Sequence, residues 1–328
     1  MSLEQSVLIC DQVNPTLNDI LEKNGLKITY EPEITPEQIS GKIEDFDVVI
    51  VRSRTKLTKD LIEKASKCKI IARVGVGLDN IDQNAAKEKG IRVINAVEGA
   101  MNAVAELVIG LMLSLAREIP RADREVRNGN WIKKELMGTE LRGKYLGIVG
   151  LGNIGKRLGR LARALNMNII GFDVVPIDDE FSKEVGLMKT DLDTLLASSD
   201  YVSLHVPLLD STKHMIDSTK MASMKNTARI INTSRGGVID EEALYQALKN
   251  GQLGGAALDV FEVEPATSNN LATLPNFIST PHMGAQTKEA QSLAANVIAE
   301  KIIQILRGVI YGCSQKLCLQ LSRLLYFL

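Results

Sequence analysis

The sequence has few of the residues on which several classes of protein depend. It contains only four cysteines, Cys10, Cys68, Cys313 and Cys318, and no Cys-x-x-Cys pair. We therefore expect reduced thiols rather than a disulfide framework, and we expect no metal site. The formal net charge is -1, which excludes the strong basic field typical of proteins that bind nucleic acid.

Long apolar runs and targeting signals are lacking too. We find no run of about 18 apolar residues that would indicate a membrane span. The first residues, MSLEQSVLICDQ, have neither the basic region nor the apolar core of a signal peptide. We therefore expect a cytoplasmic protein that contacts neither membrane nor nucleic acid.

The length of 328 residues favours two domains, since single cores rarely grow beyond about 250–300 residues. Short apolar runs alternate with helical patterns, which predicts parallel sheets covered by helices on both faces. The predicted strands are 6–10, 47–51, 70–74, 92–95, 145–150, 168–173, 200–206, 228–233, 254–260 and 277–280. A helix is predicted from Thr35, its N-cap, with Pro36 at the first helical position, and two more helices are predicted at 59–66 and 81–90. A long helical segment follows over 102–131, and a last helix begins at Thr287.

A glycine-rich turn in the middle of the chain is typical of dinucleotide binding. Gly150, Gly152 and Gly155 form a Gly-x-Gly-x-x-Gly pattern between a strand and a helix, and the next strand ends at Asp173. Such glycines permit the tight bend, the approach of a pyrophosphate and close helix packing, while the acid accepts hydrogen bonds from ribose. No arginine directly follows Asp173, so we expect NAD rather than NADP. The alternatives are a turn without a ligand and a methyltransferase that binds another adenosine compound.

Three polar residues follow three late strands. Arg235, Glu264 and His282 come after the strands 228–233, 254–260 and 277–280. Because open α/β sheets bind ligands at the carboxyl ends of their strands, we expect the three side chains at one edge. An arginine can hold a carboxylate by two hydrogen bonds, a histidine can accept a hydroxyl proton, and a carboxylate can orient the imidazole. The set fits dehydrogenation of a 2-hydroxy acid; a structural ion pair is the alternative for Arg235 and Glu264.

The other two histidines receive lesser roles. His205 ends the strand 200–206, so we expect it to face the cofactor, and it is the second candidate for the proton acceptor. His214 lies in a polar stretch and is expected at the surface.

The chain resembles the D-isomer-specific 2-hydroxyacid dehydrogenases over roughly residues 3–308. The matching blocks are VRSRTKLT (51–58), RVGVGLDNID (73–82), GNWIKKELMGTEL (129–141), GIVGLGNIG (147–155), HVPLLDST (205–212), NTSRGGVIDEEAL (232–244), ALDVFEVEP (257–265) and TPHMGAQT (280–287). The resemblance implies two doubly wound parallel-sheet α/β domains of Rossmann-like or flavodoxin-like type, one inserted into the other. It implies a substrate domain of 1–97 and 286–308, an NAD-binding domain of 98–285, and an unassigned tail, 309–328.

The resemblance also implies roles for individual residues. It assigns catalysis to Arg235, Glu264 and His282, with Arg235 and His282 also contacting the substrate. Further substrate contacts are implied at Arg52, Ser53, Gly75 and Lys133. The expected cofactor contacts are Val76, Gly150, Gly152, Asn153, Ile154, Gly155, Asp173, His205, Val206, Pro207, Thr233, Asp259 and Gly284.

The substrate and the assembly follow from the same resemblance. Since Arg235 accounts for the reacting carboxylate, Arg52 and Lys133 are spare cations that favour a phosphorylated acid, and we expect NAD-dependent oxidation of 3-phosphoglycerate to 3-phosphohydroxypyruvate. The alternatives are a glyoxylate or hydroxypyruvate reductase, another D-2-hydroxyacid dehydrogenase, or, outside the enzymes, an NAD-sensing module like the corepressors of this scaffold. Ala100 and Met101 stand where relatives often carry polar residues. A two-fold homodimer is implied through the long helical segment around 102–130.

Overall fold

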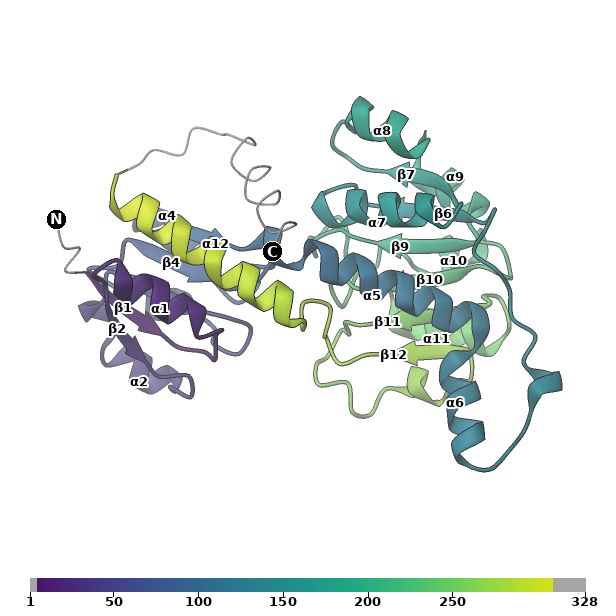
Figure 1. Ribbon diagram of the computed structural model, residues 1–328, viewed down its shortest axis with the longest axis horizontal. Helices are drawn as coiled ribbons and strands as arrows, with labels where there is room; N and C mark the ends of the chain where they lie inside the picture. Colours follow the sequence, from purple (N-terminus) through teal and green to yellow (C-terminus); the bar gives the residue numbers. More distant parts are fainter. Residues whose placement is uncertain (1–4, 309–328) are drawn as a thin grey trace. The chain divides into compact units, whose positions relative to one another are not determined.

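The structure, a computed structural model, describes residues 5–308, and the chain divides into two compact units (Figure 1). The first holds the described residues up to Ala96 and those from Ser292 onward, and the second holds Val97–Gln291. The chain returns to the first unit along α12 (Lys288–Leu306), where the Thr287 hydroxyl accepts a hydrogen bond from the Ala290 amide. The domain boundaries expected from the sequence stay predictions, and the segment 309–328 lies outside the described residues.

The first unit is built on a parallel sheet of five strands. Their order is β2-β1-β3-β4-β5, so the chain turns back between the neighbouring strands β1 and β3. Such a reversal is the place where doubly wound sheets bind ligands. The strands are β1 (Ser6–Ile9), β2 (Lys27–Tyr30), β3 (Val48–Val51), β4 (Ile70–Arg73) and β5 (Arg92–Asn95).

Helices cover both faces of this sheet, which is why β3 is apolar throughout and β1 and β4 are apolar except at one end. On one face α12 packs with α1 (Thr16–Lys23) over β1, β3 and β4. The other face is covered by α2 (Pro36–Ser40), η1 (Ile43–Asp45), α3 (Lys59–Lys64) and α4 (Gln83–Glu88). Thr35 caps α2, as the sequence predicts, and the structure adds a capping box, in which Thr35 and Gln38 bond each other's backbone amides.

The second unit is built on a parallel sheet of seven strands. Their order is β12-β11-β10-β9-β6-β7-β8, and the chain turns back between β6 and β9. The glycine-rich turn therefore follows the strand at which the direction of winding reverses. The strands are β6 (Tyr145–Val149), β7 (Asn168–Phe172), β8 (Met188–Lys189), β9 (Tyr201–Leu204), β10 (Arg229–Asn232), β11 (Gly255–Leu258) and β12 (Phe277–Ser279).

Two layers of helices complete this unit. One face is covered by α5 (Val97–Arg117), α7 (Asn153–Ala164) and α8 (Asp179–Val185). The opposite face carries α9 (Leu192–Ser198), α10 (Ser218–Ala222) and α11 (Glu241–Lys249), and η3 (Asn270–Thr273) lies at its margin. Both units are thus doubly wound α/β domains with parallel sheets, and the predicted fold class is confirmed.

The long helical segment expected over 102–131 is two helices. The first, α5, ends at Arg117, Glu118 adopts a left-handed conformation with φ of 50°, and α6 covers Ile119–Arg127. The break has a simple cause, because Pro120 has no amide hydrogen to donate and is tolerated only in the first turn of a new helix. Beyond α6 the chain forms an arm that contains η2 (Lys133–Glu135).

Helix α5 is long and apolar enough, by length and composition, to cross a membrane, contrary to the expectation that no such segment exists. Its apolar side chains are largely accounted for inside the unit. Ala105, Val108, Leu111 and Met112 are buried in the cluster shared with α7 and the sheet. This burial identifies α5 as a core helix.

Two strands, β2 and β8, were not predicted from the apolar runs in the sequence. Both β2 and β8 lie at an edge of their sheet, and neither is buried along its length. An edge strand with exposed positions needs no continuous apolar run, so the signal that reveals the central strands is missing.

Candidate active site

The glycine-rich turn has room for a ligand only on one side. Gly150 has a φ of 92°, and a Cβ atom there would lie 2.5 Å from the His205 carbonyl oxygen. A Cβ at Gly155 would lie 2.1 Å from the Gly150 oxygen, so helix α7 sits directly against the turn. At Gly152, the residue that precedes α7, no atom lies within 4 Å of an added Cβ. This open side, next to the first amides of a helix at Asn153 and Ile154, suits a pyrophosphate.

Asp173 is fixed beside this turn. One carboxylate oxygen accepts a hydrogen bond from the Leu151 amide at 2.6 Å, and the other accepts one from the Val175 amide at 3.0 Å. Each oxygen keeps a further lone pair, so the carboxylate can also accept hydrogen bonds from ribose hydroxyls. Both bonds found here come from backbone amides, and a 2′-phosphate would meet the bare carboxylate charge.

Two more of the predicted cofactor contacts have distinctive surroundings. The Thr233 hydroxyl is buried and has no hydrogen-bond partner among the described residues. Asp259 is 1% exposed, and its carboxylate accepts hydrogen bonds from the Thr280 hydroxyl and from the amides of Met283 and Gly284, at 2.6 to 2.8 Å. Buried polar groups are normally paired. The Thr233 hydroxyl can therefore bond a ligand, and the turn, Asp173 and Thr233 together fit NAD.

The imidazole of His282 is held by Glu264. Its Nδ1 lies 2.8 Å from a Glu264 carboxylate oxygen, and the other oxygen accepts a hydrogen bond from the Phe261 amide at 3.1 Å. His282 has a φ of 51° in the loop after β12 that Asp259 anchors. With Nδ1 engaged, Nε2 is the nitrogen left to accept a proton from a substrate.

The loop that carries Arg235 packs against the loop that carries Glu264. A Cβ at Gly236 would lie 1.8 Å from the Phe261 carbonyl oxygen, so only glycine permits this approach. Asn232, 1% exposed, donates to the Arg235 carbonyl at 2.9 Å and accepts from the Ser234 amide at 3.0 Å. The structure thus brings the three predicted catalytic residues into adjoining loops, with a direct contact between Glu264 and His282.

Sequence reasoning missed residues that bind these loops together. His214, expected only to be at the surface, donates its amide to the Gly237 carbonyl at 2.7 Å, and its ring lies 3.0 Å from a Glu262 carboxylate oxygen. Glu241 accepts a hydrogen bond from the Glu262 amide at 2.6 Å, and its own amide donates to the Glu262 side chain at 3.2 Å. Burial raises the pKa of Glu241, and the neighbouring Glu262 and Glu264 carboxylates add to the shift. In the sequence Glu241 is only a common first-turn helix acid.

His205 is unsuited to be the proton acceptor. Its Nε2 lies 2.9 Å from the Ser203 hydroxyl, and burial lowers the pKa of its ring to about 4. The imidazole is therefore neutral at physiological pH and weakly basic. Val206 and Pro207 follow it after β9, and their contacts with the cofactor stay predictions.

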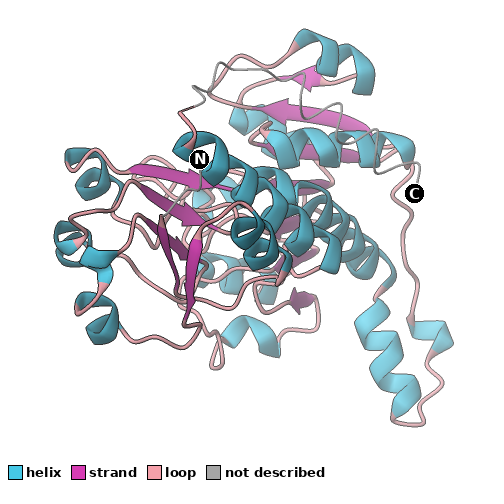
Figure 2. Ribbon diagram, turned by 60° about the vertical axis from the view of Figure 1, so that its left-hand side comes forward, coloured by secondary structure: helices cyan, strands magenta, loops and turns pink. Residues whose placement is uncertain are grey.

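The remaining predicted residues lie elsewhere. Arg52, Ser53, Gly75 and Val76 belong to the first unit, in the loops after β3 and β4. Lys133 lies on the exposed arm, which Figures 1 and 2 show extending beyond α6, and the structure does not place it beside Arg235, Glu264 and His282. Its contact with the substrate stays a prediction.

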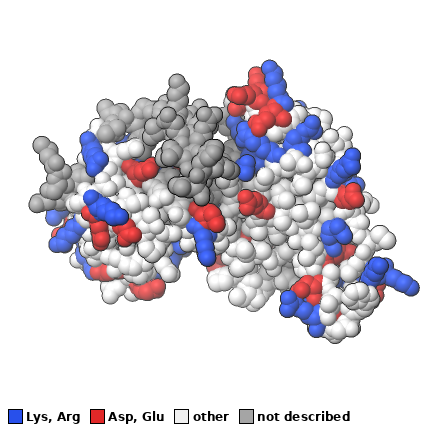
Figure 3. All heavy atoms as spheres, viewed as in Figure 1, with Lys and Arg blue, Asp and Glu red and all other residues white. Residues whose placement is uncertain are grey.

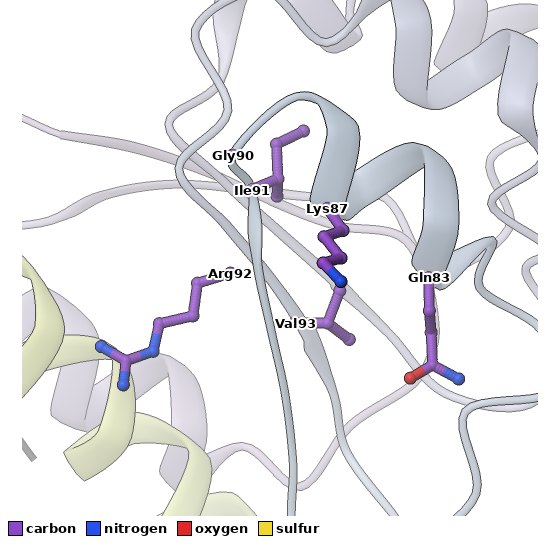
Figure 4. Close-up of a pocket in the computed structure, with 6 residues that line it drawn as sticks. All are labelled: Gln83, Lys87, Gly90, Ile91, Arg92 and Val93. Carbon is purple, nitrogen blue, oxygen red and sulfur yellow. The ribbon is translucent and has the colours of Figure 1, made fainter.

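A surface hollow in the first unit contains none of these residues. Figure 4 shows that it lies between α4, which contributes Gln83 and Lys87, and β5, which contributes Arg92 and Val93. Charge is mixed on the face seen in Figure 3. Over α7 and α8, for example, Arg160 pairs with Glu184 and Lys156 with Asp178. On that face the described residues form no continuous basic patch.

Comparison with known proteins identifies the family. Residues 109–284 match the NAD-binding domain of the D-isomer-specific 2-hydroxyacid dehydrogenases. Hydroxypyruvate reductase of Thermotoga maritima is 46% identical over 87% of this chain and 92% of its own. The chain belongs to the D-isomer-specific 2-hydroxyacid dehydrogenases. The residues that match the NAD-binding domain lie within the second unit, Val97–Gln291.

Other members of the family extend the comparison. D-3-phosphoglycerate dehydrogenase of Methanocaldococcus jannaschii is 48% identical over 92% of this chain. The match covers 57% of that relative, so the chain spans a little over half the length of some dehydrogenases it resembles. A glyoxylate reductase from Paecilomyes thermophila has a similar structure, with a TM-score of 0.85, 30% identity, and coverage of 93% of this chain and 96% of its own.

The low pKa of His205 predicts a specific effect of pH on stability. The unfolded chain takes up a proton at this ring below about pH 6.5, whereas the folded chain does so only near pH 4. The free energy of unfolding should therefore decrease as pH falls from about 6.5 to about 4, by on the order of 3 kcal/mol from this group. Urea unfolding at pH 7.5 and pH 4.5 should show a smaller loss in His205→Gln than in wild type. Equal losses would contradict the prediction.

Proposed function

We propose that this dehydrogenase oxidises 3-phospho-D-glycerate to 3-phosphohydroxypyruvate with NAD, the first step of serine biosynthesis. The observation that carries the dehydrogenase chemistry is the 2.8 Å contact between His282 Nδ1 and Glu264 beside the Arg235 loop. The 48% identity with a D-3-phosphoglycerate dehydrogenase supports the choice of acid.

The residues of the site divide the work of the reaction. Arg235 binds the substrate carboxylate through two parallel hydrogen bonds, which fixes the C2 hydroxyl relative to His282. Nε2 of His282 accepts the hydroxyl proton, and Glu264 stabilises the imidazolium that results. NAD held at the glycine-rich turn would supply the acceptor for the hydride that leaves C2. Asp259 keeps the His282 loop in place through the Thr280, Met283 and Gly284 bonds.

The phosphate of the substrate is the feature that needs a further cation. The Arg235 guanidinium is committed to the carboxylate, and a phosphate carries close to two negative charges at neutral pH. Arg52 presents a planar guanidinium that matches phosphate in two hydrogen bonds, and it lies in a loop at the reversal point of the first sheet. We assign the phosphate to Arg52, with Lys133 as the second predicted contact.

A hydroxypyruvate reductase is the second candidate. The chain matches 92% of the length of the Thermotoga maritima enzyme of that name, compared with 57% of the phosphoglycerate dehydrogenase. An unphosphorylated acid has no charge for Arg52 to neutralise. The two candidates therefore differ in what the removal of Arg52 should do.

We propose that the protein is a homodimer, formed through the α5–α6 segment and its arm. Trp131 and Met137 on the arm are 81% and 86% exposed. Arg121 pairs with Glu118 and Glu135 and so holds η2 to α6, which keeps the apolar side chains presented. Large exposed apolar side chains on an ordered arm favour a protein partner, and a second copy supplies the same surface.

Loss of the proton acceptor should nearly abolish turnover. We expect His282→Ala to lower kcat by roughly 10²–10⁴-fold, the usual range for loss of a general base. Glu264→Gln should cost less, because the amide can still contact the ring but carries no charge. Steady-state kinetics with NAD affinity as the folding control measures this. Near-normal turnover in folded His282→Ala would exclude the assignment, and a wild type that turns over no 2-hydroxy acid would favour an NAD-sensing module.

Substrate choice is tested by comparing 3-phospho-D-glycerate with D-glycerate. Removing one partner of a partly desolvated charge pair costs roughly 2–5 kcal/mol. Arg52→Ala should therefore lower kcat/KM for the phosphorylated acid steeply and leave D-glycerate almost unchanged. If the wild type uses the two acids equally well, or prefers hydroxypyruvate and glyoxylate, the reductase is the better assignment.

The mass in solution tests the dimer. Light scattering should give twice the 35.9 kDa of the chain, and the double variant Trp131→Lys, Met137→Lys should shift the population toward the monomer. Charges at these two positions would have to be desolvated in the interface. Because both side chains are exposed, thermal unfolding of the variant serves as the control for folding. A monomeric wild type would rule out this assembly.

A further inference from the structure

The loop that carries Arg52 and Ser53 lies at the reversal point of the first sheet. It follows β3 directly, and β3 pairs with β1, where the Cys10 amide donates to the Ile50 carbonyl at 2.9 Å. The residues after β1 are therefore brought against the loop after β3. Asp11 is the first carboxylate on that side.

Asp11 is buried and holds the loop by its backbone. It is 2% exposed. One oxygen accepts hydrogen bonds from the amides of Arg52, at 2.5 Å, and Thr55, at 3.3 Å. The other accepts one from the Thr55 hydroxyl at 2.6 Å and lies 3.1 Å from Arg54 Nε. A buried carboxylate needs such a set of donors to offset the loss of water. These donors hold the Asp11 side chain in a fixed position relative to the loop.

Asn80 and Gln12 complete the hold on the loop. The Asn80 side-chain amide donates to the carbonyl oxygens of Arg52, at 2.7 Å, and Thr55, at 2.6 Å. The Arg52 guanidinium itself donates through Nη1 to the Gln12 carbonyl at 3.2 Å. Asp11 and Asn80 thus bind the amides and the carbonyls of the same two residues, which lie on either side of Ser53.

We propose that Asp11 and Asn80 are positioning residues for the distal phosphate of the substrate: they fix the backbone around Arg52 and Ser53, so that the guanidinium binds the phosphate with little loss of freedom. This inference rests on the assignment of the phosphate to Arg52. Arg52 would contact the phosphate before and during the reaction alike. Misplacing it therefore weakens substrate binding, and KM should rise while kcat stays nearly constant.

The chain offers a matched control at the opposite end of the same sheet. Asp47 precedes β3 and accepts hydrogen bonds from the Ser6 amide and hydroxyl, at 3.1 and 3.2 Å, and from Lys69 at 2.9 Å. Asp47→Asn removes a hydrogen-bonded carboxylate from the same unit without touching the loop after β3. It reports what a general loss of stability in this unit does to the kinetics.

The experiment compares Asp11→Asn, Asn80→Ala and Asp47→Asn. In Asp11→Asn one of the two acceptor oxygens becomes an NH₂ group, which faces donors in either orientation, the Arg52 and Thr55 amides or Arg54 Nε, and cannot accept their hydrogen bonds. We expect KM for 3-phospho-D-glycerate to rise roughly 10- to 100-fold, the cost of about 1 Å of misplacement, with kcat within about twofold. KM for D-glycerate should change much less, and NAD affinity should stay at the wild-type value. If Asp11→Asn does not fold, Asn80→Ala carries the test, because it removes the two carbonyl contacts only.

Hydrogen exchange reads out the position of the loop without any substrate. The Arg52 and Thr55 amides donate to Asp11, so exchange in a peptide spanning 52–58 should be faster in Asp11→Asn and unchanged in Asp47→Asn. Faster exchange together with the selective rise in KM supports the proposal. Unchanged exchange, or equal effects on both acids, or the same kinetic change in Asp47→Asn, overturns it. A wild type that does not prefer the phosphorylated acid overturns the assignment of Arg52 as well, and that result is visible before any variant is made.

Discussion

A strand that is buried on both faces has no place for an unpartnered polar side chain, and this constraint decides where chemistry can occur in the molecule. In β3, all four residues, Val48–Val51, are buried and aliphatic. The buried Asn232 at the end of β10 shows how a polar side chain is accommodated, since it bonds Ser234 and the Arg235 carbonyl. The predicted catalytic residues accordingly lie in loops that follow the strands, and the parallel order gathers such loops at one edge of each sheet.

Three aspartates, each at the carboxyl-end edge of the sheet of its own unit, act in the same way. Asp11, Asp173 and Asp259 each follow a strand by one or two residues, and each accepts hydrogen bonds from backbone amides of a nearby loop. The loops they fix carry, in turn, Arg52, the glycine-rich turn and His282. When the backbone of a loop is already fixed, binding a ligand costs less conformational entropy, because the loop does not have to become ordered first.

Much of this arrangement could be predicted from the sequence, and the features that could not be predicted were missed for physical reasons. The central strands, the cap of α2 and the residues after the late strands could be found because each depends on local chemistry: doubly buried strands are continuous apolar runs, and caps and tight turns require particular side chains. The edge strands β2 and β8 and the break at Glu118 were missed, since partial burial and a single proline give weaker signals. The bonds that His214, Glu241, Asp11 and Asn80 make join residues 21 to 48 positions apart, and no spacing rule predicts such partners.

The discontinuity of the first unit determines when it can finish folding during synthesis. One face of its sheet is covered by α12, whose Ile298 and Ile302 pack with Leu17 and Leu21. Lys301 bonds the Asn95 carbonyl across 206 residues of sequence, and Arg307 bonds Asn24 across 283. At ribosomal rates of about 5–20 residues per second, that apolar face waits on the order of 10–40 s for its cover. During this interval Leu17, Leu21 and the strands beneath them remain exposed on the nascent chain. The apolar surface that a chaperone would bind therefore lies at the amino-terminal end, before the second unit is complete.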